Sequence, residues 1–324
     1  MKSIIVKAHG GPEVMRLENI EKPTPTSNQV LIKVEATSVT VAHPMMRTGT
    51  PYFGRLFTGI SKPNVKSPGT DLAGSIEAVG ENVKNFQVGD QVLAATDLKM
   101  GAYSEYICLP EDGLVVHKPE NVDAAHATGI IDGGITALAF FTDQVTVNPG
   151  DKVLINGASR SIGTAAVQLA KTFGAEVTGV CSGKNVELVK ELGADEVLDY
   201  TKNELEQSEK KFDIIFDTVG KLSYRKSKKK LTEKGVFLTP VLEMPTLLTM
   251  LFLNPFSKQK LKFAATGMRK KELRMQDLKR MKEMLASEKI RTVIDKVFVL
   301  EDMEKAHAYV DQGHKRGNVI VKMP

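Results

Sequence analysis

The chain has 324 residues, of which 42% are hydrophobic and 26% charged, and a formal net charge of +5 at pH 7. This composition excludes a disordered chain and predicts a folded protein, with enough residues for two domains. Because the basic residues are spread along the sequence, the charge does not indicate a nucleic-acid partner. Two cysteines, Cys108 and Cys181, exclude a disulfide framework and favour a reducing compartment, the cytoplasm.

The sequence predicts no membrane span. Residues 1–14 contain an apolar run of only three residues, which is too short for a signal peptide or an anchor. The most apolar stretch, residues 236–256, is interrupted by Pro240, Glu243, Pro245 and Pro255. Prolines at this spacing oppose a regular helix through a bilayer.

The first third of the chain alternates short strand patterns with turn signals. Alternating or β-branched runs lie at residues 3–7, 29–36, 71–79, 91–93, 103–109 and 113–117. Glycine and proline pairs such as Pro68-Gly69 separate them. This pattern predicts a partly closed β-barrel over residues 1–122.

From Asp123 onward the pattern alternates between helix and strand, as in a doubly wound parallel sheet. The clearest unit lies at residues 150–184, where an apolar strand at 153–155 precedes a tight turn and a helix from Ser161. Gly174 lies at the C-terminal cap of that helix, and a second strand covers residues 176–180. Free backbone N–H groups at such a helix N-terminus are a natural seat for a pyrophosphate. The sequence therefore predicts a dinucleotide site in a Rossmann domain.

The turn of this unit departs from the usual G-x-G-x-x-G pattern. Its three glycine positions read Ala158, Arg160 and Gly163, so one glycine remains. Arg160 is expected either to obstruct the approach of the backbone to the phosphates or to place its guanidinium against one of them, while Ser159 and Ser161 offer hydroxyls. We favour cofactor binding, and the alternative is a unit that keeps this fold without the ligand.

The end of the second strand indicates which nicotinamide nucleotide is bound. An NAD site places Asp or Glu there, whereas residues 180–184 contain no carboxylate. The small polar Ser182 and the cationic Lys184 suit a 2′-phosphate, which favours NADPH. The alternative is that Lys184 is one more solvated lysine.

The remaining elements complete the sheet and return to the first domain. Strands are predicted at 212–216, 235–238, 293–299 and 319–322, and helices at 269–289 and 303–310. Residues 217–220 end a strand at the carboxyl edge of the sheet, where ligands of open α/β folds bind. The basic run 221–234 is interpreted as a solvated helix. We expect the Rossmann domain over 123–290, with 291–324 completing the β-rich domain.

Several ordered motifs resemble the medium-chain dehydrogenases/reductases. They are residues 1–39, the segment PGTDLAGSIEAVGENVKNFQVGDQV, the phrase GAYSEY and the final HKRGNVIV. Within that superfamily the chain is most similar to the zinc-independent quinone oxidoreductase branch. The resemblance implies a GroES-like N-terminal domain, a Rossmann domain, an active site in the cleft between them and a homodimer.

The resemblance also bears on catalytic zinc. Zinc members of the superfamily bind the metal through Cys, a Gly-His-Glu motif and a further Cys, whereas here Thr40 resembles the first ligand position and Gly69-Thr70-Asp71 replaces the motif. Zinc prefers thiolate and imidazole, so metal-assisted alcohol oxidation is disfavoured. What remains is a zinc-independent reductase whose small-molecule substrates accept hydride readily, such as quinones and α,β-unsaturated carbonyls.

The resemblance further implies residue roles. The residues that match its cofactor contacts are Ser159, Arg160, Ser161, Ile162, Ser182, Lys184, Tyr200, Thr218, Val219 and Asn318. Thr40 falls where relatives often carry an Asn that faces the substrate, so it is our first hydrogen-bond donor to the substrate oxygen. Tyr52 and Thr136 are the next candidates for a catalytic role.

Three features have open interpretations. Asp132 is either a buried acid with a raised pKa that donates a proton or, as we favour, a helix N-cap. His43 is either a proton donor or, more commonly for a lone histidine in a loop, a surface residue. Residues 239–256 are too apolar to leave in water, so we expect them to line the substrate mouth or contact a second subunit, the alternative being a core helix.

Two rival functions stay open at this point. One is a catalytically weak NADPH-binding protein that senses redox state or docks a partner, suggested by Arg160 and by the lack of an evident acid. The other is a zinc-type alcohol dehydrogenase, which the missing ligands disfavour.

Overall fold

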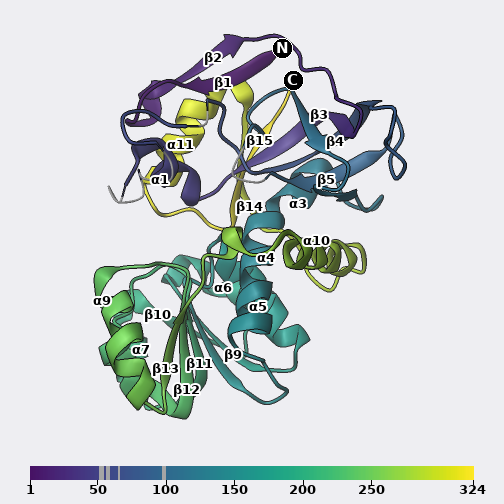
Figure 1. Ribbon diagram of the computed structural model, residues 1–324. Helices are drawn as coiled ribbons and strands as arrows, with labels where there is room; N and C mark the ends of the chain where they lie inside the picture. The colour runs from purple at the N-terminus through teal and green to yellow at the C-terminus, as the bar shows by residue number, and fades with distance from the viewer. Residues whose placement is uncertain (51–54, 56–58, 65, 97–99) are drawn as a thin grey trace. The chain divides into compact units, whose positions relative to one another are not determined.

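The computed structural model describes residues 1–50, 55, 59–64, 66–96 and 100–324. The chain forms two compact units, whose elements are labelled in Figure 1. Unit 1 consists of Met1–Asp132 and Lys270–Pro324, and unit 2 consists of Gly133–Arg269. Unit 1 has the GroES-like architecture and unit 2 the Rossmann architecture, so the predicted fold class is confirmed.

Unit 1 is built on a seven-stranded sheet with the order β14-β15-β3-β4-β5-β7, and β6 also pairs with β3. Its strands are β3 (Gln29–Val39), β4 (Asp71–Val79), β5 (Gln91–Ala95), β6 (Tyr106–Pro110), β7 (Leu114–His117), β14 (Ile294–Val299) and β15 (Asn318–Lys322). The long β3 pairs with β4 along one edge and divides its other edge between β15, at residues 36–39, and β6, at residues 29–33. Sharing one edge between two strands curves the sheet into a partly closed barrel.

A hairpin and four helices complete unit 1. They are β1 (Lys2–Val6), β2 (Met15–Asn19), α1 (Ala42–Thr48), α3 (Ala124–Gly129), α10 (Lys271–Ala286) and α11 (Met303–Asp311). Buried apolar side chains of β1, β2, β15 and α11 form one core cluster, and α3 packs against β3, β4 and β15. The elements from the two ends of the chain therefore share one core, as Figure 1 shows for β1, β2 and α11.

Unit 2 is a parallel six-stranded sheet with the order β10-β9-β8-β11-β12-β13. Its strands are β8 (Lys152–Asn156), β9 (Glu176–Cys181), β10 (Glu196–Asp199), β11 (Phe212–Asp217), β12 (Leu231–Thr239) and β13 (Lys260–Phe263). Its helices are α4 (Ile131–Ala139), which begins in unit 1, α5 (Ser161–Thr172), α6 (Val186–Glu191), α7 (Glu204–Gln207), α8 (Tyr224–Ser227) and α9 (Met244–Leu248). The order reverses between β8 and β11, which is the position where open α/β sheets bind ligands.

Two segments of unit 2 differ from the sequence expectation. The basic run 221–234 is not one helix, because α8 has four residues and strand β12 begins at Leu231. Residues 244–256 are helical rather than irregular, since Pro245 and Pro255 lie in the first turns of α9 and of the 3-10 helix Asn254–Phe256. Proline is tolerated there because the first N–H groups of a helix need no intrahelical acceptor.

One helical stretch of the described residues has the length and composition of a membrane span. It is Ala124–Gln144, and 83% of its most apolar window is buried inside the protein. This burial is expected of a core helix in a globular chain.

Candidate active site

The phosphate turn of unit 2 depends on two glycines. Gly157 has φ +78°, and a Cβ there would lie 2.6 Å from Val219 Cγ1 and 2.7 Å from Thr218 Oγ1. A Cβ on Gly163 would lie 2.0 Å from the carbonyl oxygen of Gly157, so this glycine permits the close contact between helix α5 and the turn. Arg160 has φ −93° and ψ 175°, an extended conformation that suits any residue. The sequence pattern did not count Gly157 among the glycines of the turn, and the backbone at Arg160 is unstrained.

Hydroxyl and amide groups gather at the start of α5. The N-cap residue of this helix, Arg160, makes no side-chain hydrogen bond to the N–H groups of the first turn. Ser159 and Ser161 are buried beside them. Asn185 Nδ2 donates to Ser159 Oγ at 3.0 Å and to Ser182 Oγ at 3.2 Å, which joins two of the predicted cofactor residues. Asn185 itself was missed, although it directly follows Lys184 in the sequence.

Positive charge lies beside this cluster. Lys184 is exposed on the short 3-10 helix Gly183–Asn185, and Tyr200 is 53% exposed. Burial lowers the pKa of Arg160, while its interaction with Tyr200 acts in the opposite direction, so these two predicted residues are neighbours. An arginine, a lysine and a phenol hydroxyl can together bind a phosphate.

Asp199 is a carboxylate that sequence reasoning overlooked, because it ends the neighbouring strand β10 rather than β9. Its Oδ1 accepts from the Thr201 N–H at 2.9 Å and from the Thr201 hydroxyl at 2.8 Å. These bonds, together with one from the Gly183 backbone, hold the pKa of Asp199 below its usual range. Asp199 thereby anchors the turn that carries Lys184.

The carboxyl ends of β8 and β11 lie next to the phosphate turn. The backbone N–H and the hydroxyl of Thr218 both donate to the carbonyl oxygen of Asn156, at 3.1 and 2.8 Å. Asn156 Nδ2 in turn donates to Asp217 Oδ1 at 2.8 Å. Since Gly157 packs on Thr218 and Val219, the structure brings both predicted residues to the turn.

Helix α4 packs close to the start of α5. A Cβ on Gly133 would lie 2.6 Å from the carbonyl oxygen of Ser161. The candidate Thr136 is buried one turn further along, and its Oγ1 lies 3.2 Å from Thr266 Oγ1. Thr136 therefore has a hydrogen-bond partner within unit 2.

Thr40 is the most unusual polar residue of unit 1. It follows β3 directly, is 3% exposed, and its Oγ1 has no hydrogen-bond partner among the described residues. An unsatisfied buried hydroxyl costs about 1–3 kcal/mol. Such a cost is typical of a group whose partner is a ligand. The backbone N–H of Thr40 donates to His43 Nδ1 at 3.2 Å, which fixes the residue in place.

His43 is buried, so its interpretation as a surface residue in a loop is wrong. It lies in helix α1 and is 1% exposed. Burial lowers the pKa of its imidazole to about 3, and the charge of Lys315 lowers it further, so the ring is neutral. Its Nε2 lies 3.0 Å from Thr70 Oγ1. Helix α1 reaches this position because β3 ends just before it.

Asp71 and Asp132 form a pair of interacting carboxyls. Burial raises the pKa of Asp71 to about 7, the charge of Asp132 raises it further, and a 2.8 Å hydrogen bond from Ser38 Oγ opposes the rise. Asp132 is the second residue of α4, so the preferred interpretation as an N-cap is wrong. Burial raises its pKa, and Lys315 opposes the rise. At neutral pH the pair retains a proton, as a proton donor requires.

Asn318 and Tyr52 are the two remaining predicted site residues. The backbone N–H and the Nδ2 of Asn318, at the start of β15, both donate to the carbonyl oxygen of Val293, at 2.8 and 3.1 Å. Its role at the cofactor stays a prediction. Tyr52 lies outside the described residues.

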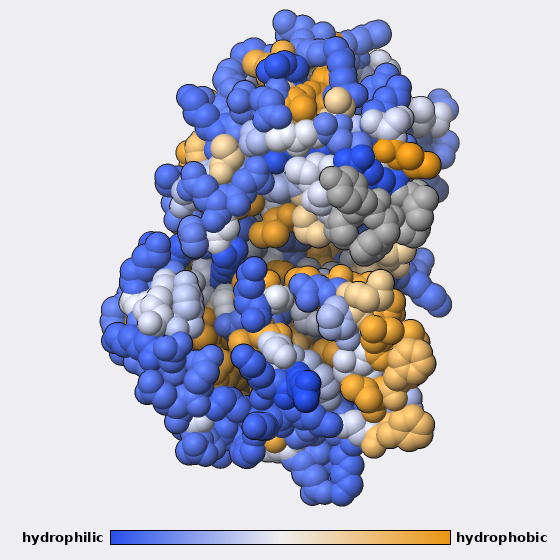
Figure 2. Space-filling view, turned by 90° about the vertical axis from the view of Figure 1, so that its left-hand side faces the viewer, coloured by the Kyte–Doolittle hydropathy of each residue, from blue (hydrophilic) through white to orange (hydrophobic). Residues whose placement is uncertain are grey.

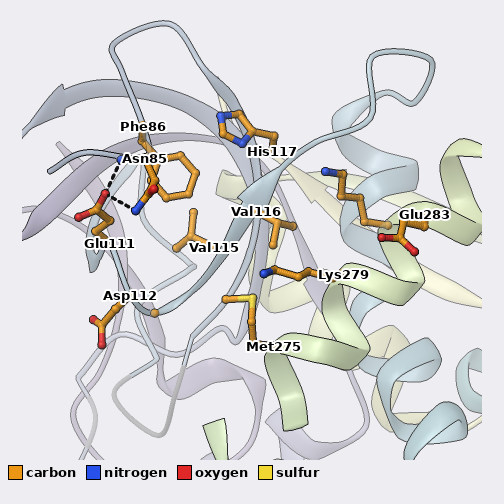
Figure 3. A pocket seen from close by; sticks show the side chains of 12 residues that line it. Asn85, Phe86, Glu111, Asp112, Val115, Val116, His117, Met275, Lys279 and Glu283 are labelled. Carbon is orange, nitrogen blue, oxygen red and sulfur yellow. Dashed lines mark hydrogen bonds between the residues drawn. The ribbon is translucent and has the colours of Figure 1, made fainter. Parts of the chain in front are cut away.

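A hollow of about 430 Å³ lies in unit 1 between β7 and α10, as Figure 3 shows. Its floor is apolar, with Phe86, Val115 and Met275, and Lys279 and Glu283 project from α10. Phe86 stacks on the ring of His117 at 5.0 Å. None of the predicted site residues lines this hollow, so it is not the candidate site.

Comparison with known proteins identifies the family. The sequence models described as "Alcohol dehydrogenase GroES-like domain" and "Zinc-binding dehydrogenase" match residues 26–120 and 192–321. The quinone oxidoreductase QR1 of Triphysaria versicolor, a chloroplastic protein, is 32% identical over 97% of this chain and 95% of its own. The chain belongs to the medium-chain dehydrogenase/reductase superfamily. Within it, the chain lies in the zinc-independent, quinone oxidoreductase-like branch.

Two further proteins are similar to this chain. The chloroplastic NADPH-dependent alkenal/one oxidoreductase of Arabidopsis thaliana is 30% identical over 99% of this chain and 79% of its own. A solved Escherichia coli quinone oxidoreductase in complex with NADPH has a TM-score of 0.84 at 21% identity, and the match covers 99% of this chain and 100% of that chain. The solved structure shows that the fold is shared, and the relatives support an oxidoreductase.

One matched family name mentions zinc, but the ligand types are missing. By resemblance, Thr40 and Thr70 fall at positions where zinc members of the superfamily carry Cys and His, which stays a prediction. Across residues 1–50, 55, 59–64, 66–96 and 100–324, no three His, Cys, Asp or Glu residues gather as metal ligands.

Proposed function

We propose that this protein is a zinc-independent, NADPH-dependent reductase of quinones or α,β-unsaturated carbonyls. The observation that carries the proposal is the buried hydroxyl of Thr40, which has no hydrogen-bond partner in the part of the chain that the structure describes. The family resemblance implies that Thr40 falls at a metal-ligand position of the zinc members. A hydroxyl donor stabilises a developing oxyanion without a metal. The names of the quinone and alkenal/one oxidoreductases among the relatives support the substrate class.

The residues of unit 2 fit a nicotinamide dinucleotide. The N-terminus of α5 suits a pyrophosphate, since its backbone N–H groups receive no hydrogen bond from the N-cap side chain. The glycines at 157 and 163 permit the close packing of the turn against β11 and α5. Lys184, Arg160 and Tyr200 provide the charge and hydrogen bonds for a 2′-phosphate, which supports NADPH over NADH. When bound, the nicotinamide supplies a hydride from C4 and ends as NADP⁺.

Unit 1 supplies the remaining groups for the reduction. Thr40 Oγ1 donates a hydrogen bond to the substrate oxygen as negative charge develops on it. An enone takes the hydride at its β-carbon and a proton at its α-carbon, and a quinone takes one hydride and one proton to become a hydroquinone. The Asp71–Asp132 pair retains a proton at neutral pH and is our candidate for its source.

NADPH oxidation, followed at 340 nm with a p-benzoquinone and an aliphatic enone as substrates, tests this function. We expect turnover that persists after EDTA treatment and stoichiometric formation of the hydroquinone or the saturated ketone. Tight NADPH binding without turnover of any quinone or enone would favour the weakly catalytic sensor instead. Activity that EDTA abolishes and zinc restores would favour the zinc-type dehydrogenase.

We further propose that a second copy of the chain covers the apolar surface of unit 2. The exposed residues of that surface are Met244, Leu247, Leu248, Leu251, Phe252, Leu253 and Phe256. Figure 2 shows hydrophobic side chains gathered on one side of this unit. The adjacent β13 is an edge strand, and the side chain of Asn254 already pairs with its Leu261, donating to the carbonyl oxygen at 2.6 Å and accepting from the N–H at 2.9 Å. The apolar side chains, rather than the strand edge, are therefore what a homodimer covers.

Sedimentation velocity at micromolar concentration tests the dimer. We expect Phe252→Asp with Leu251→Asp to convert a dimer into a folded monomer, because two charges enter the interface. Val88→Asp is the matched control, since Val88 is an equally exposed residue of unit 1, at 62%. A wild-type protein that sediments as a monomer at these concentrations refutes the proposal.

We propose the cytoplasm as the compartment of the protein. Cys108 and Cys181 are both free, and burial raises the pKa of both thiols, which suits a reducing environment. The chloroplastic relatives show that members of the family differ in compartment. Fractionation of cells that express the tagged chain tests the proposal, and recovery in an organelle fraction contradicts it.

A further inference from the structure

A chain of hydrogen-bonded side chains crosses unit 1 and ends at the candidate site, with its four middle members buried, its first member exposed and its last half-buried. It joins residues from α1, the turn before β4, the segment before β6, and α11. In order, they are Asp311, Arg47, His307, Tyr103, His43 and Thr70. Tyr103 and His307 are 0% exposed, His43 1% and Arg47 3%. Buried polar groups of this kind are stable only when each one has a partner.

The hydrogen bonds of this chain are short and continuous. Arg47 Nη2 donates to Asp311 Oδ2 at 2.7 Å, and Arg47 Nη1 lies 2.8 Å from His307 Nδ1. His307 Nε2 lies 3.2 Å from Tyr103 Oη, and Tyr103 Oη lies 2.7 Å from His43 Nδ1. The last bond joins His43 Nε2 to Thr70 Oγ1 at 3.0 Å. Gly69 makes room for this arrangement, because a Cβ on it would lie 2.6 Å from the Tyr103 ring.

Arg47 determines the tautomer of His307. A guanidinium has only donors and keeps its proton in proteins. The Nδ1 atom of His307 must therefore accept from Arg47, which leaves the ring proton of the neutral imidazole on Nε2. Burial holds the pKa of His307 well below its usual value, so the ring is neutral. His307 Nε2–H consequently donates to Tyr103 Oη.

The backbone of Thr40 determines the tautomer of His43 in the same way. Its N–H donates to His43 Nδ1, so this nitrogen accepts and the ring proton lies on Nε2. Tyr103 keeps its proton, because burial raises its pKa well above the usual value, and its O–H therefore donates to the same Nδ1. His43 Nε2–H then donates to Thr70 Oγ1. All the bonds from Arg47 to Thr70 run in one direction.

We propose that His43, Tyr103 and His307 are positioning residues, and that Arg47 fixes the direction of the hydrogen bonds through which they hold Thr40 and Thr70. His43 contacts both threonines, through Nδ1 for the Thr40 backbone and through Nε2 for the Thr70 hydroxyl. The backbone of Thr40 is thereby held in place, and its hydroxyl, which has no partner among the described residues, is available to a substrate oxygen. The chain is not a proton relay, because it passes through the guanidinium of Arg47, which cannot release a proton.

The tautomers test the proposal without any assumption about activity. We would label the full-length protein with ¹⁵N-histidine, assign His43 and His307 by single His→Gln variants, and record long-range ¹H–¹⁵N correlation spectra at pH 7. We expect both rings to be neutral, with Nδ1 unprotonated and Nε2 protonated. An Nδ1–H tautomer or an imidazolium at either residue would overturn the proposal.

Variants then test the direction of the chain. Asp311→Asn alone serves as the control for Arg47→Met with Asp311→Asn, in which no unpaired charge remains. In the double variant His307 Nδ1 loses the donor Arg47, while Nε2–H keeps its acceptor Tyr103 Oη, so we expect the Nδ1 ¹⁵N resonance to move toward that of an unbonded ring nitrogen, which the single variant does not show. An unchanged His307 Nδ1 resonance in the folded double variant would contradict the role of Arg47. If the double variant fails to fold, the wild-type tautomers still decide the proposal.

The kinetic part of this inference rests on the proposed reductase function. Tyr103→Phe keeps the ring but breaks the chain, and we expect it to lower kcat about 100-fold, with the KM for NADPH unchanged. His43→Asn, whose Oδ1 can still accept from the Thr40 N–H, should retain more turnover than His43→Leu. Equal losses in the last two variants would indicate a merely structural role. If the wild type shows no turnover, the proposed function is wrong. The tautomers of His43 and His307 then still test the proposed directions of the hydrogen bonds.

Discussion

The phosphate turn of unit 2 and the hydroxyl cluster of unit 1 are built in opposite ways. The turn is formed by neighbours in sequence, Gly157 to Gly163, and the nearby side chains of Lys184 and Tyr200 reach solvent. The cluster, which is the chain from Asp311 to Thr70 together with Thr40, joins residues up to 264 positions apart and is buried at its centre. The comparison teaches that a local, solvated site suits the binding of a charged cofactor, whereas a buried hydrogen-bonded chain beside one unpartnered hydroxyl suits the precise placement of that hydroxyl.

Asp71→Asn should show the largest effect, because it removes a buried charge from the cluster. The pKa of Asp71 is raised to about 7 in the folded protein, against 3.8 for an ordinary aspartate. The folded state therefore binds more protons, and the contribution of Asp71 to stability falls as pH rises from about 4 to about 7. In urea unfolding, Asp71→Asn should gain stability over the wild type through this window, by up to ~4 kcal/mol at pH 8.

Asp112→Asn is the matched control for this pH series. Asp112 is an exposed carboxylate whose pKa is lowered by its hydrogen bond and ion pair with Lys271. Its removal should change stability slightly and in the destabilising direction at neutral pH. A gain in Asp71→Asn that does not depend on pH would contradict the raised pKa of Asp71.

Thr40→Val should show the next largest effect. It distinguishes a role of the hydroxyl in the reaction from a role in the binding of NADPH. Loss of one donor to a developing oxyanion lowers kcat by about 10²- to 10³-fold, or about 3–4 kcal/mol. Thr40→Ser keeps a hydroxyl and should restore most of the turnover, and both variants should bind NADPH as the wild type does. Steady-state kinetics with a saturating quinone measures this, and wild-type turnover in Thr40→Val would exclude the hydroxyl from the chemistry.

Gly157→Ala probes the turn and should cost about 2 kcal/mol of stability, as well as affinity for NADPH. The new Cβ meets Val219 and Thr218 side chains and requires φ +78° from an alanine. Gly150→Ala is an informative control, because Gly150 has φ +84° but nothing within 4 Å of the added Cβ. Gly150→Ala should lower the free energy of unfolding only through backbone strain, and it should leave NADPH affinity unchanged. Equal losses of affinity in both variants would refute the packing argument.

Lys184→Ala should have the smallest effect, because the side chain is exposed and water screens its charge. We expect about tenfold weaker binding of NADPH and unchanged binding of NADH. Lys229→Ala, an exposed lysine of the basic run, should change neither affinity. A salt titration sharpens the result, since the loss should shrink as ionic strength rises.

The turn of unit 2 could be predicted from sequence patterns more fully than the cluster of unit 1. A βαβ unit is local, so its strand, turn and helix periods appear within 35 residues, and Ser159, Ser182 and Thr218 were found from pattern and family resemblance. The apolar runs of β8 and β11 likewise predicted these two strands from the sequence. Asp199 was missed because strand order, which sets neighbours at the carboxyl edge, is a property of the fold rather than of the local sequence.

The cluster was largely hidden from the sequence. His43 was interpreted as a surface residue because no local pattern shows that Tyr103 and His307 close over it. Asp132 was taken for a cap because the start of α4 cannot be located to one residue from periodicity. Thr40 was found through family resemblance, and its unpartnered hydroxyl became evident only when its surroundings were assembled.

The central claim is that the turn of unit 2 binds the cofactor and that Thr40 of unit 1 takes part in the reaction. One paired measurement tests this claim most directly. Fluorescence titration with NADPH and single-turnover NADPH oxidation would be run side by side on the wild type, Lys184→Ala and Thr40→Val. Our account predicts that Lys184→Ala weakens binding while its bound NADPH still reacts at the wild-type rate, and that Thr40→Val binds normally but reacts at least 100-fold more slowly. Normal reaction in Thr40→Val, or normal NADPH binding in Lys184→Ala, would contradict the account.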